Sequence, residues 1–347
     1  MKAVSFMNGF FFTAFYKYIS LMAAFHNKDI SKNSFLVTGG AGFIGSHIVE
    51  YLLTHNAGKV RVLDNLATGS IKNVELFAAY KQYEFILGDI RDAGVCNNAC
   101  EGIDYVTHQA ALGSVPRSVK DPITSNEVNV GGFVNMITAA KNAGVKSFVY
   151  ASSSSVYGDE PNLPKREEKT GNLLSPYAVT KMANELYAAV FHALYGLNVI
   201  GLRYFNVFGP RQDPNGPYAA VIPLFVSGIL NGNAVYINGD GAQTRDFTFV
   251  ENAVQANIKG MLSTNEAAFG KAYNVAVGAN FSVSFLYNTI REMLGITHEP
   301  THREPRAGDI HDSLANISRA TELLGYQPAM QFLDGLKITV EYFKNDN

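Results

Sequence analysis

The stretch FLVTGGAGFIGSH, from Phe35 to His47, decides the fold of this chain. A short apolar run leads into glycines, and a helix-like pattern follows from Phe43 to Leu53. Glycine permits a tight turn and lets the backbone approach a pyrophosphate closely. The start of a helix adds free N–H groups and the positive end of the helix dipole. Unless they serve packing alone, the glycines of this loop predict a dinucleotide-binding turn: Gly39, Gly40, Gly42 and Gly45.

An acidic residue further along supports this interpretation. Asp64 closes the strand-like segment KVRVLD, 64 − 45 = 19 residues past Gly45. A carboxylate at this position binds the ribose hydroxyls of adenosine. It would repel a 2′-phosphate, so NAD is favoured over NADP. Asp89 and Ile90, after the third strand-like segment, are expected to flank the adenine, although Asp89 could be an ordinary turn or capping residue.

Strand-like and helix-like segments alternate over the first two thirds of the chain. This alternation predicts an α/β fold of the Rossmann type, a doubly wound parallel sheet with right-handed crossovers. The expected strands are Phe35–Thr38, Lys59–Asp64, Tyr83–Ile90, Asp104–Ala111, Ser147–Ser154 and Leu197–Asn206, and the longest expected helices are Pro122–Ala143 and Pro176–Tyr195.

The composition of the sequence changes after Asn206. Residues Gly209–Pro223 are rich in Pro and Gly, which predicts a loop, and shorter strands and helices follow. We therefore expect an N-terminal arm over 1–33, an NAD-binding domain over 34–205 and a smaller, mainly substrate-binding α/β domain over 206–347. A later segment, about 240–278, is expected to return to the first domain.

Composition excludes several classes of protein. The 347 residues are 47% hydrophobic and 17% charged, which is an ordinary globular mixture, and the net charge of −2 provides no basic surface for nucleic acid. The two cysteines, Cys96 and Cys100, cannot build a disulfide framework and do not match the common zinc spacings. No metal site is predicted, and a reduced, cytoplasmic compartment fits best.

The N-terminal segment FMNGFFFTAFYKYISLMAAF, from Phe6 to Phe25, is apolar and aromatic, with Lys17 as its one charge. It could be a signal peptide or membrane anchor. Polar residues interrupt it, however, and no clear small-residue cleavage site follows. An arm that packs on the domain, without membrane insertion, is the favoured interpretation, and translation from Met22 is a further alternative.

The segment SPYAVTK places Tyr177 and Lys181 four residues apart, on one face of a helix. A lysine ammonium beside a phenol favours the phenolate and is expected to lower the tyrosine pKa. The pair is therefore a candidate general base at neutral pH. The alternative is a surface tyrosine beside a surface lysine.

Several long strings now resemble one enzyme family, the extended short-chain dehydrogenases/reductases. Within it, the chain looks like the UDP-hexose 4-epimerases, and more narrowly like the UDP-N-acetylglucosamine 4-epimerases of surface-polysaccharide synthesis. Besides the glycine loop, the strings are HQAALGSVPRSV, SSSSVYG, SPYAVTK, GLRYFNVFGPRQDPNGPYAAVIP, YINGDG and PRAGDIHDSLA, which together span about Ser34 to Ala315.

The resemblance implies a catalytic set of Tyr177, Lys181 and Ser153. Tyr177 would exchange a proton with the sugar 4-hydroxyl, Lys181 would bind the nicotinamide ribose, and Ser153 would bond to the same hydroxyl. Hydride leaves C4 for NAD, a 4-keto sugar turns over while UDP stays fixed, and hydride returns to the other face. NAD is thus a retained cofactor.

The resemblance also implies two sets of ligands. The expected cofactor contacts are Gly39, Gly42, Phe43, Ile44, Gly45, Asp64, Asn65, Thr68, Gly69, Asp89, Ile90, Gln109, Ala110, Ala111, Asn129, Tyr177, Lys181, Tyr204 and Val207. The expected substrate contacts are Gly113, Ser114, Ser153, Ser154, Ser155, Asn206, Ala220, Val221, Tyr236, Asn238, Arg245, Arg306, Asp309 and Ser313. Arg245 and Arg306 would hold the diphosphate, because arginine binds phosphate in a bidentate manner.

Related chemistries on the same scaffold are less compatible with the residues. The 4,6-dehydratases carry an Asp-Glu pair before the VYG string, and the UDP-glucuronate decarboxylases carry a Glu at the second position. This chain has Ser154 and Ser155 there, and neither can act as a carboxylic acid. A non-catalytic NAD-binding regulator remains a different class of alternative.

Two further expectations follow from the resemblance. The chain should form a homodimer through the helices at Pro122–Ala143 and Pro176–Tyr195. Ser313 stands where members restricted to UDP-glucose and UDP-galactose carry a bulky Tyr, so it should leave room for a 2-acetamido group. UDP-N-acetylglucosamine is therefore the expected substrate, with its uronic acid or UDP-glucose as alternatives.

Overall fold

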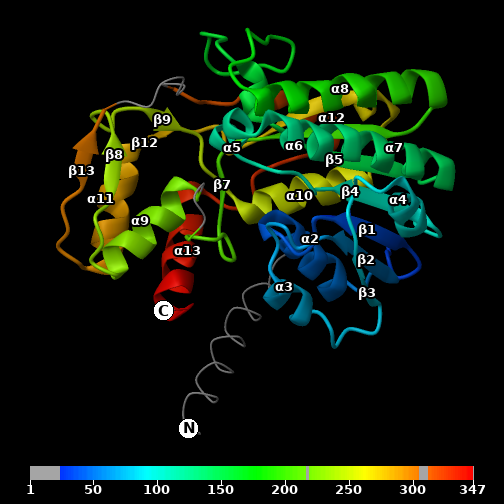
Figure 1. Cartoon of the computed structure of the whole chain (residues 1–347), viewed down its shortest axis with the longest axis horizontal. Coiled ribbons are helices and arrows are strands. Elements are labelled where there is room, and N and C mark those ends of the chain that lie inside the picture. Colours follow the sequence, from blue (N-terminus) through cyan, green and yellow to red (C-terminus); the bar gives the residue numbers. More distant parts are fainter. Residues whose placement is uncertain (1–23, 216–218, 305–311, 347) are drawn as a thin grey trace, which may run out of the picture.

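The computed structural model describes residues 24–215, 219–304 and 312–346. Its centre is a seven-stranded sheet in the order β11-β6-β5-β4-β1-β2-β3, and every neighbouring pair of strands is parallel (Figure 1). The strands are β1 (Ser34–Thr38), β2 (Lys59–Asp64), β3 (Tyr83–Leu87), β4 (Tyr105–His108), β5 (Ser147–Ser153), β6 (Val199–Tyr204) and β11 (Lys271–Val275). The predicted doubly wound sheet is confirmed.

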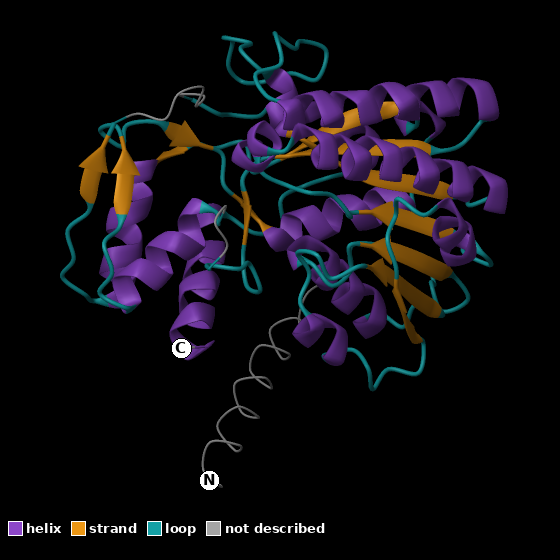
Figure 2. Ribbon diagram, viewed as in Figure 1, coloured by secondary structure: helices purple, strands orange, loops and turns teal. Residues whose placement is uncertain are grey.

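Helices cover both faces of this sheet (Figure 2). One face carries α2 (Phe43–Thr54) and α10 (Val250–Met261), and the other carries α4 (Ala93–Cys100), α7 (Gly132–Ala143) and α8 (Pro176–Tyr195). Neighbouring residues of a strand contribute to opposite cores, as Val149 packs on the first face and Phe148 on the second. The strands therefore read as continuous apolar runs, which is typical of parallel sheets covered on both sides.

A third core lies beside the sheet and belongs to the later part of the chain. It packs α9 (Val221–Leu230), α11 (Val283–Leu294) and α13 (Phe332–Asp346) against short paired strands. These are β7 (Val207–Phe208) with β10 (Thr248–Phe249), β8 (Tyr236–Asn238) with β13 (Thr301–Arg303), and β9 (Thr244–Arg245) with β12 (Phe281–Ser282). Between these strands the chain returns to the large sheet through α10 and β11. The domain boundaries that we expected from the sequence remain a proposal.

The remaining elements are short. They are α3 (Ile71–Glu75), α5 (Val115–Lys120), α6 (Pro122–Asn126), α12 (Ser318–Leu324), a π-turn η1 (Glu127–Gly131) and two 3₁₀ turns, η2 (Ser154–Tyr157) and η3 (Glu266–Ala268). The helix expected over Pro122–Ala143 is thus α6, η1 and α7 in succession. A π-turn inside a helix often marks a functional position.

The strands end earlier than the sequence suggested. β3 stops at Leu87 instead of Ile90, and β4 stops at His108 instead of Ala111. The residues after each strand bend into a pocket, which Gly88 and Ala111 both line. At these two strands the pocket is therefore lined by residues that follow the regular strand.

The start of the described chain packs on α2. The backbone N–H of Phe25 donates to the Tyr51 hydroxyl at 2.7 Å, and the two rings stack with centroids 5.2 Å apart. Residues 1–23, which make up most of the expected arm, lie outside the described residues. No helix in the described part of the chain is long and apolar enough to cross a membrane.

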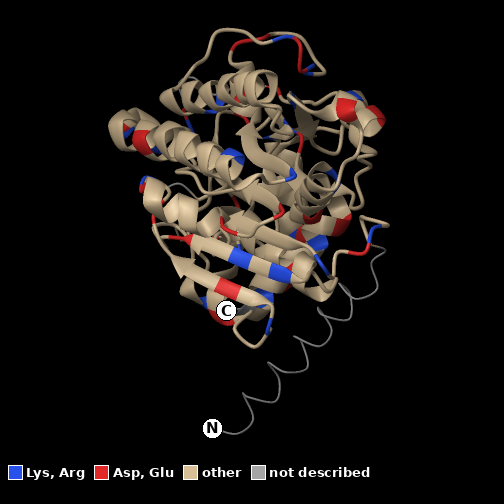
Figure 3. Ribbon diagram, turned by 90° about the vertical axis from the view of Figure 1, so that its right-hand side faces the viewer, with Lys and Arg blue, Asp and Glu red and all other residues tan. Residues whose placement is uncertain are grey.

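Charges of both signs lie side by side at the sheet edge (Figure 3). Lys59 and Arg61 on β2 both pair with Glu84 on β3, at 2.7 and 2.9 Å. The view in Figure 3 thus shows mixed charges rather than a continuous basic surface, in keeping with the small net charge.

Candidate active site

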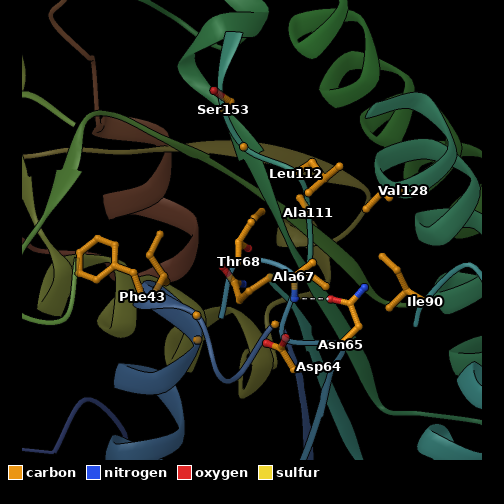
Figure 4. A pocket seen from close by; sticks show the side chains of 18 of the residues that line it. Phe43, Asp64, Asn65, Ala67, Thr68, Ile90, Ala111, Leu112, Val128 and Ser153 are labelled. Atoms are coloured by element: carbon orange, nitrogen blue, oxygen red, sulfur yellow. Dashed lines mark hydrogen bonds between the residues drawn. The ribbon is translucent and has the colours of Figure 1, made fainter. Parts of the chain in front are cut away.

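A pocket of about 510 Å³ lies at the carboxyl ends of the parallel strands. The strand order reverses beside β1, which has β2 on one side and β4 on the other. Open α/β sheets bind ligands at this switch point. One end of the pocket holds Asp64 and Asn65, and Ser153 lies at the opposite end (Figure 4).

The glycine loop forms the floor of this pocket, and its shape requires glycine. Gly39 has φ +68°, and a Cβ there would lie 2.7 Å from the backbone nitrogen of Ala110. A Cβ at Gly45 would lie 2.1 Å from the carbonyl oxygen of Gly39. Gly42 precedes α2, and no side chain caps the first turn of this helix. The loop therefore leaves a backbone-lined hollow at a helix N-terminus, where an anion is favoured.

Asp64 ties the glycine loop to the second strand. Its carboxylate accepts hydrogen bonds from the backbone N–H groups of Ala41, at 3.0 Å, and Leu66, at 2.8 Å. The side chain is buried, and this burial raises its pKa although the backbone hydrogen bonds lower it. Asp64 lines the pocket, so its carboxylate is available to a ligand there.

Asp89 is held beside the pocket rather than on its wall. Arg91 donates to its carboxylate at 2.8 Å, and Asn65 does so at 3.0 Å. These bonds, led by the one from Arg91, lower its pKa to about 2. Ile90 and Arg91 line the pocket in its place, so Asp89 orients its neighbours.

The candidate catalytic residues meet at the other end of the pocket. Ser175 caps α8, Pro176 opens it, and Tyr177 follows in the first turn. The Ser153 side chain, at the end of β5, lies close enough to the Tyr177 hydroxyl to lower its pKa. Lys181, one helical turn later, donates from Nζ to a backbone oxygen of the same strand end. The sequence-predicted triad is thus brought together on one wall.

The expected direction of the Tyr177 pKa is wrong for the chain as described. Burial raises this pKa, and Ser153 lowers it by less. The Lys181 ammonium lies 5.8 Å from the centroid of the tyrosine ring. Burial lowers the pKa of Lys181 itself to about 8. Sequence spacing predicted the proximity of the pair but not the desolvation of both groups.

Most of the expected cofactor contacts line the pocket. They are Gly39, Gly42, Phe43, Ile44, Gly45, Asp64, Asn65, Thr68, Ile90, Gln109, Ala110, Ala111, Tyr177, Lys181, Tyr204 and Val207. Gly69 and Asn129 lie behind the wall with Asp89. The Asn129 side chain, for example, accepts a bond from the backbone N–H of Leu112 at 2.8 Å. The individual contacts stay predictions.

The expected substrate contacts are more dispersed. Gly113, Ser153 and Asn206 line the pocket. Ser114 caps α5, Ser154 and Ser155 form part of η2, and Ala220 and Val221 begin α9. Tyr236 and Asn238 lie on β8, Arg245 lies on β9, and the backbone N–H of Ser313 donates to the oxygen of Thr244 beside Arg245. Arg306 and Asp309 lie outside the described residues.

Sequence reasoning missed several wall residues: Leu63, Ala67, Gly88, Arg91, Leu112, Thr124, Val128, Ala151 and Ser152. Most are chain neighbours of predicted contacts, so a wider window at each strand end would have found them. Thr124 and Val128 come from α6 and η1 and gave no local signal. Outside the pocket, the Arg303 guanidinium lies 5.0 Å from the ring centroid of Tyr236, one of the expected substrate contacts.

A residue of α10 supports the pocket wall from behind. The Asn257 side chain donates to the hydroxyl of Tyr204 at 2.7 Å and accepts from the Gln109 amide at 3.0 Å. Gln109 and Tyr204 also bond to each other at 3.0 Å. Two wall residues are thereby held by a helix that lies in sequence between α9 and α11 of the third core.

Comparison with known proteins agrees with this site. The model of the NAD dependent epimerase/dehydratase family matches residues 35–276, which is well over half of the chain. The chain belongs to this family. A UDP-glucose 4-epimerase of Mycolicibacterium smegmatis is 39% identical over 312 residues, covering 89% of this chain and 98% of the relative.

Solved structures give the same result. A UDP-N-acetylglucosamine 4-epimerase from Methanobrevibacter ruminantium, in complex with UDP-N-acetylmuramic acid, is 41% identical with a TM-score of 0.85, covering 91% of this chain and 99% of that one. A UDP-glucose 4-epimerase from Thermotoga maritima, with UDP-glucose, is 35% identical with a TM-score of 0.84, covering 90% and 99%. The predicted family, the NAD cofactor and the isomerase class are confirmed.

The residues of the pocket fit NAD. The glycine cradle at the N-terminus of α2 suits a pyrophosphate, and the buried carboxylate of Asp64 suits ribose hydroxyls. At the far end, Tyr177 and Lys181 lie where a nicotinamide would meet a substrate. One continuous pocket joins both ends, as an extended dinucleotide requires.

Proposed function

We propose that this enzyme interconverts UDP-N-acetylglucosamine and UDP-N-acetylgalactosamine by inverting C4 of the sugar. The observation that carries the proposal is the meeting of Ser153, Tyr177 and Lys181 on one wall of the pocket that the glycine loop begins. A general base, a hydroxyl that orients the reacting group and a cation are the parts that oxidation of a secondary alcohol needs.

Tyr177 is the proposed proton acceptor. Its hydroxyl takes the proton of the sugar 4-hydroxyl as C4 becomes a carbonyl, and it returns the proton after the 4-keto sugar has turned over. When bound, NAD supplies the hydride acceptor and donor for C4. Ser153, beside Tyr177 on the pocket wall, holds the same oxygen in line. Burial raises the Tyr177 pKa in the chain as described, and a positive charge placed near the phenol would act in the opposite direction by favouring the phenolate.

Lys181 and Asp64 are the proposed cofactor-binding side chains. Lys181 is 3% exposed and carries its ammonium on the pocket wall, within reach of the nicotinamide ribose. Asp64 lies at the adenosine end and accepts ribose hydroxyls. Its charge would repel a 2′-phosphate, so we propose a preference for NAD over NADP.

The acetamido sugar is the finer part of the proposal. Ser313 is small, and its backbone is tied to the strand that carries Arg245. A serine there leaves room for a 2-acetamido group during rotation, whereas a tyrosine would clash. The likeness to a structure described as a UDP-N-acetylglucosamine 4-epimerase supports this choice. A uronic acid form of the same sugar is the second candidate, and UDP-glucose, named for several relatives, is the third.

Dehydration is disfavoured by the residues at η2. Ser154 and Ser155 stand where a dehydratase would need an acid pair, and neither lines the pocket. A 4,6-dehydratase from Streptomyces venezuelae is nevertheless similar in fold, with 32% identity and a TM-score of 0.84. The scaffold is therefore compatible with both chemistries, and the side chains favour epimerisation.

We propose that the enzyme works as a homodimer in the cytoplasm and provides sugar nucleotides for surface polysaccharides. The outer face of α8 is apolar, with Leu186, Val190 and Leu194 at least half exposed and spaced four residues apart. Ile123 on α6 is 71% exposed. Pairing this face with a second copy would bury it. Cys96 and Cys100 are free thiols, which suits a reducing compartment.

One comparison tests the proposal. The purified enzyme should interconvert the two UDP-N-acetylhexosamines without added cofactor, with a higher kcat/KM than for UDP-glucose or the uronic acid. A higher value for UDP-glucose would reject the substrate choice. Release of stoichiometric NADH without sugar conversion would reject the epimerase and favour an NAD-binding regulator.

A further inference from the structure

The end of β5 is held by side chains of α8 rather than by its sheet neighbours alone. β4 pairs with β5 only as far as Tyr150, whereas β6 continues to Ser153. The strand end therefore lacks a ladder partner on one side. This end of β5, which is unsupported on one side, carries Ser153, and Ser153 lines the pocket together with Tyr177.

Two of the α8 contacts come from the proposed catalytic residues. Lys181 donates to the carbonyl oxygen of Ala151, and Tyr177 lies beside Ser153 on the pocket wall. Both side chains also have proposed roles with the cofactor or the sugar, so these two contacts are shared with the reaction.

A third contact between α8 and β5 comes from Glu185, which has no proposed role in binding the cofactor or the sugar. Glu185 continues the row of Tyr177 and Lys181 on α8 at the same four-residue spacing. The hydroxyl of Ser152 donates to Glu185 Oε1 at 2.5 Å. Ser152 lines the pocket beside Ser153, so three successive residues of β5 meet three successive members of one helical row.

Glu185 is itself fixed by a bidentate ion pair. Arg203 donates from Nε to Oε1 at 2.9 Å and from Nη2 to Oε2 at 2.7 Å. Arg203 is the registered partner of Ser152 on β6, so the carboxylate bridges two neighbouring strands. The two side chains are 10% and 5% exposed. A buried ion pair is weak evidence for added stability, since desolvation offsets the attraction.

We propose that Glu185, paired with Arg203, is a positioning residue: by accepting the hydrogen bond from Ser152, it fixes the end of β5 and so places Ser153 beside Tyr177. This inference rests on the proposed function, since it assigns Glu185 to the same reaction. It predicts that the pair acts on the geometry of the catalytic step rather than on binding of the cofactor or the nucleotide.

Further contacts connect Arg203 to the segment near Ser313. The Arg203 guanidinium stacks on Tyr157 at 4.9 Å, and the Tyr157 hydroxyl donates to Asn274 at 2.6 Å. The Asn274 amide in turn donates to the backbone oxygen of Asn316 at 2.9 Å. The same pair is thus connected to the segment that carries Ser313.

The test is a Glu185→Gln variant of the full-length enzyme with its bound NAD. The amide keeps the size but loses the charge and turns a donor toward Arg203. We expect kcat to fall by about tenfold to a hundredfold, as a small misplacement of reacting groups does. KM and the NAD content should stay within about twofold of the wild type, because neither Glu185 nor Arg203 lines the pocket.

A second readout does not depend on turnover. With ¹³Cζ-tyrosine labelling, and assignment through Tyr177→Phe, NMR follows the titration of Tyr177 in the holoenzyme. Displacement of Ser153 should raise the Tyr177 pKa in the Glu185→Gln variant, because Ser153 lowers it in the wild type. If the wild type converts none of the UDP-sugars, the proposed function fails, while this titration still tests Glu185.

Two further variants keep the inference testable. Ser152→Ala removes only the hydroxyl that Glu185 grips, should Glu185→Gln not fold, and should change kcat and the Tyr177 pKa in the same directions. The double variant should be no slower than Glu185→Gln, because both act through one contact. Glu84→Gln, which breaks the Arg61 pair on the far side of the sheet, is the matched control and should leave kcat unchanged.

Three results would overturn the inference. They are an unchanged kcat and Tyr177 titration in a folded Glu185→Gln variant, a change confined to KM, and additive losses in the double variant. An equal loss of kcat in Glu84→Gln would assign the effect to general destabilisation.

Discussion

The ammonium of Lys181 lies 2.7 Å from the carbonyl oxygen of Ala151, so the helix that carries the proposed base is fastened directly to the strand that carries the proposed serine. Lys181 is 3% exposed, and burial lowers its pKa to about 8. The charge of this lysine is therefore adjustable within the range of ordinary assays. Tyr177, by contrast, has its pKa raised by burial.

Tyr177→Phe should lower kcat by about a hundredfold or more, because it removes the proposed proton acceptor. The ring remains, so the folded structure and the bound NAD should persist, as circular dichroism and the absorbance of released cofactor would show. Turnover close to that of the wild type would reject the assignment.

The rate at which bound NAD exchanges with labelled NAD should rise as pH increases through about 8, where Lys181 loses its proton. Lys181→Met should exchange quickly at every pH. The folded state binds fewer protons than the unfolded state between the lowered pKa of about 8 and the ordinary value of 10.5. Stability from this group should therefore increase with pH across that window, measured by urea unfolding. A flat exchange profile for the wild type would contradict this role.

The purified protein should contain NAD and little NADP, identified by chromatography of the released cofactor. Asp64→Asn should weaken this discrimination, since it removes the charge that repels a 2′-phosphate. Tight binding of NADP to the wild type, measured by calorimetry, would show that Asp64 does not select the cofactor.

Ser313→Tyr should reduce turnover of UDP-N-acetylglucosamine while sparing UDP-glucose, because a larger side chain would obstruct the acetamido group. The control is the ratio of kcat/KM for the two substrates in the same preparation, because a general loss of activity would lower both values and leave their ratio unchanged. If acetamido-sugar turnover survives, the size selection depends on residues other than Ser313.

Leu194→Lys, alone or with Leu186→Lys, should convert the dimer to a monomer, as sedimentation at micromolar concentration would show. Both leucines are more than 60% exposed on α8, and a buried charge there would oppose association. Leu87→Lys, at a position that is 67% exposed on β3, is the matched control and should remain dimeric. A wild-type monomer under the same conditions would dismiss the dimer itself.

Local patterns were sufficient to predict the parallel sheet, the glycine loop and the proximity of Tyr177 to Lys181, whereas Ser153 was implied only by the family resemblance. Each depends on residues whose types and spacing carry a physical requirement, such as the glycine at Gly45. The roles of Thr124, Val128 and Asn257 could not be predicted from the sequence, because these residues reach the pocket through packing between segments that are distant in the chain. The pKa of Tyr177 was wrong in direction because sequence spacing does not report burial.

The return of the chain through α10 and β11 has a consequence for synthesis on the ribosome. β11 pairs with β6 at the edge of the large sheet, although the elements from β7 to α10 lie between them in sequence. Asn257 of α10, which props Gln109 and Tyr204, also emerges late. A nascent chain that ends near residue 205 thus lacks both the edge strand of the large sheet and the contacts of Asn257, so the sheet and this wall of the pocket are complete only after about residue 275 has left the exit tunnel.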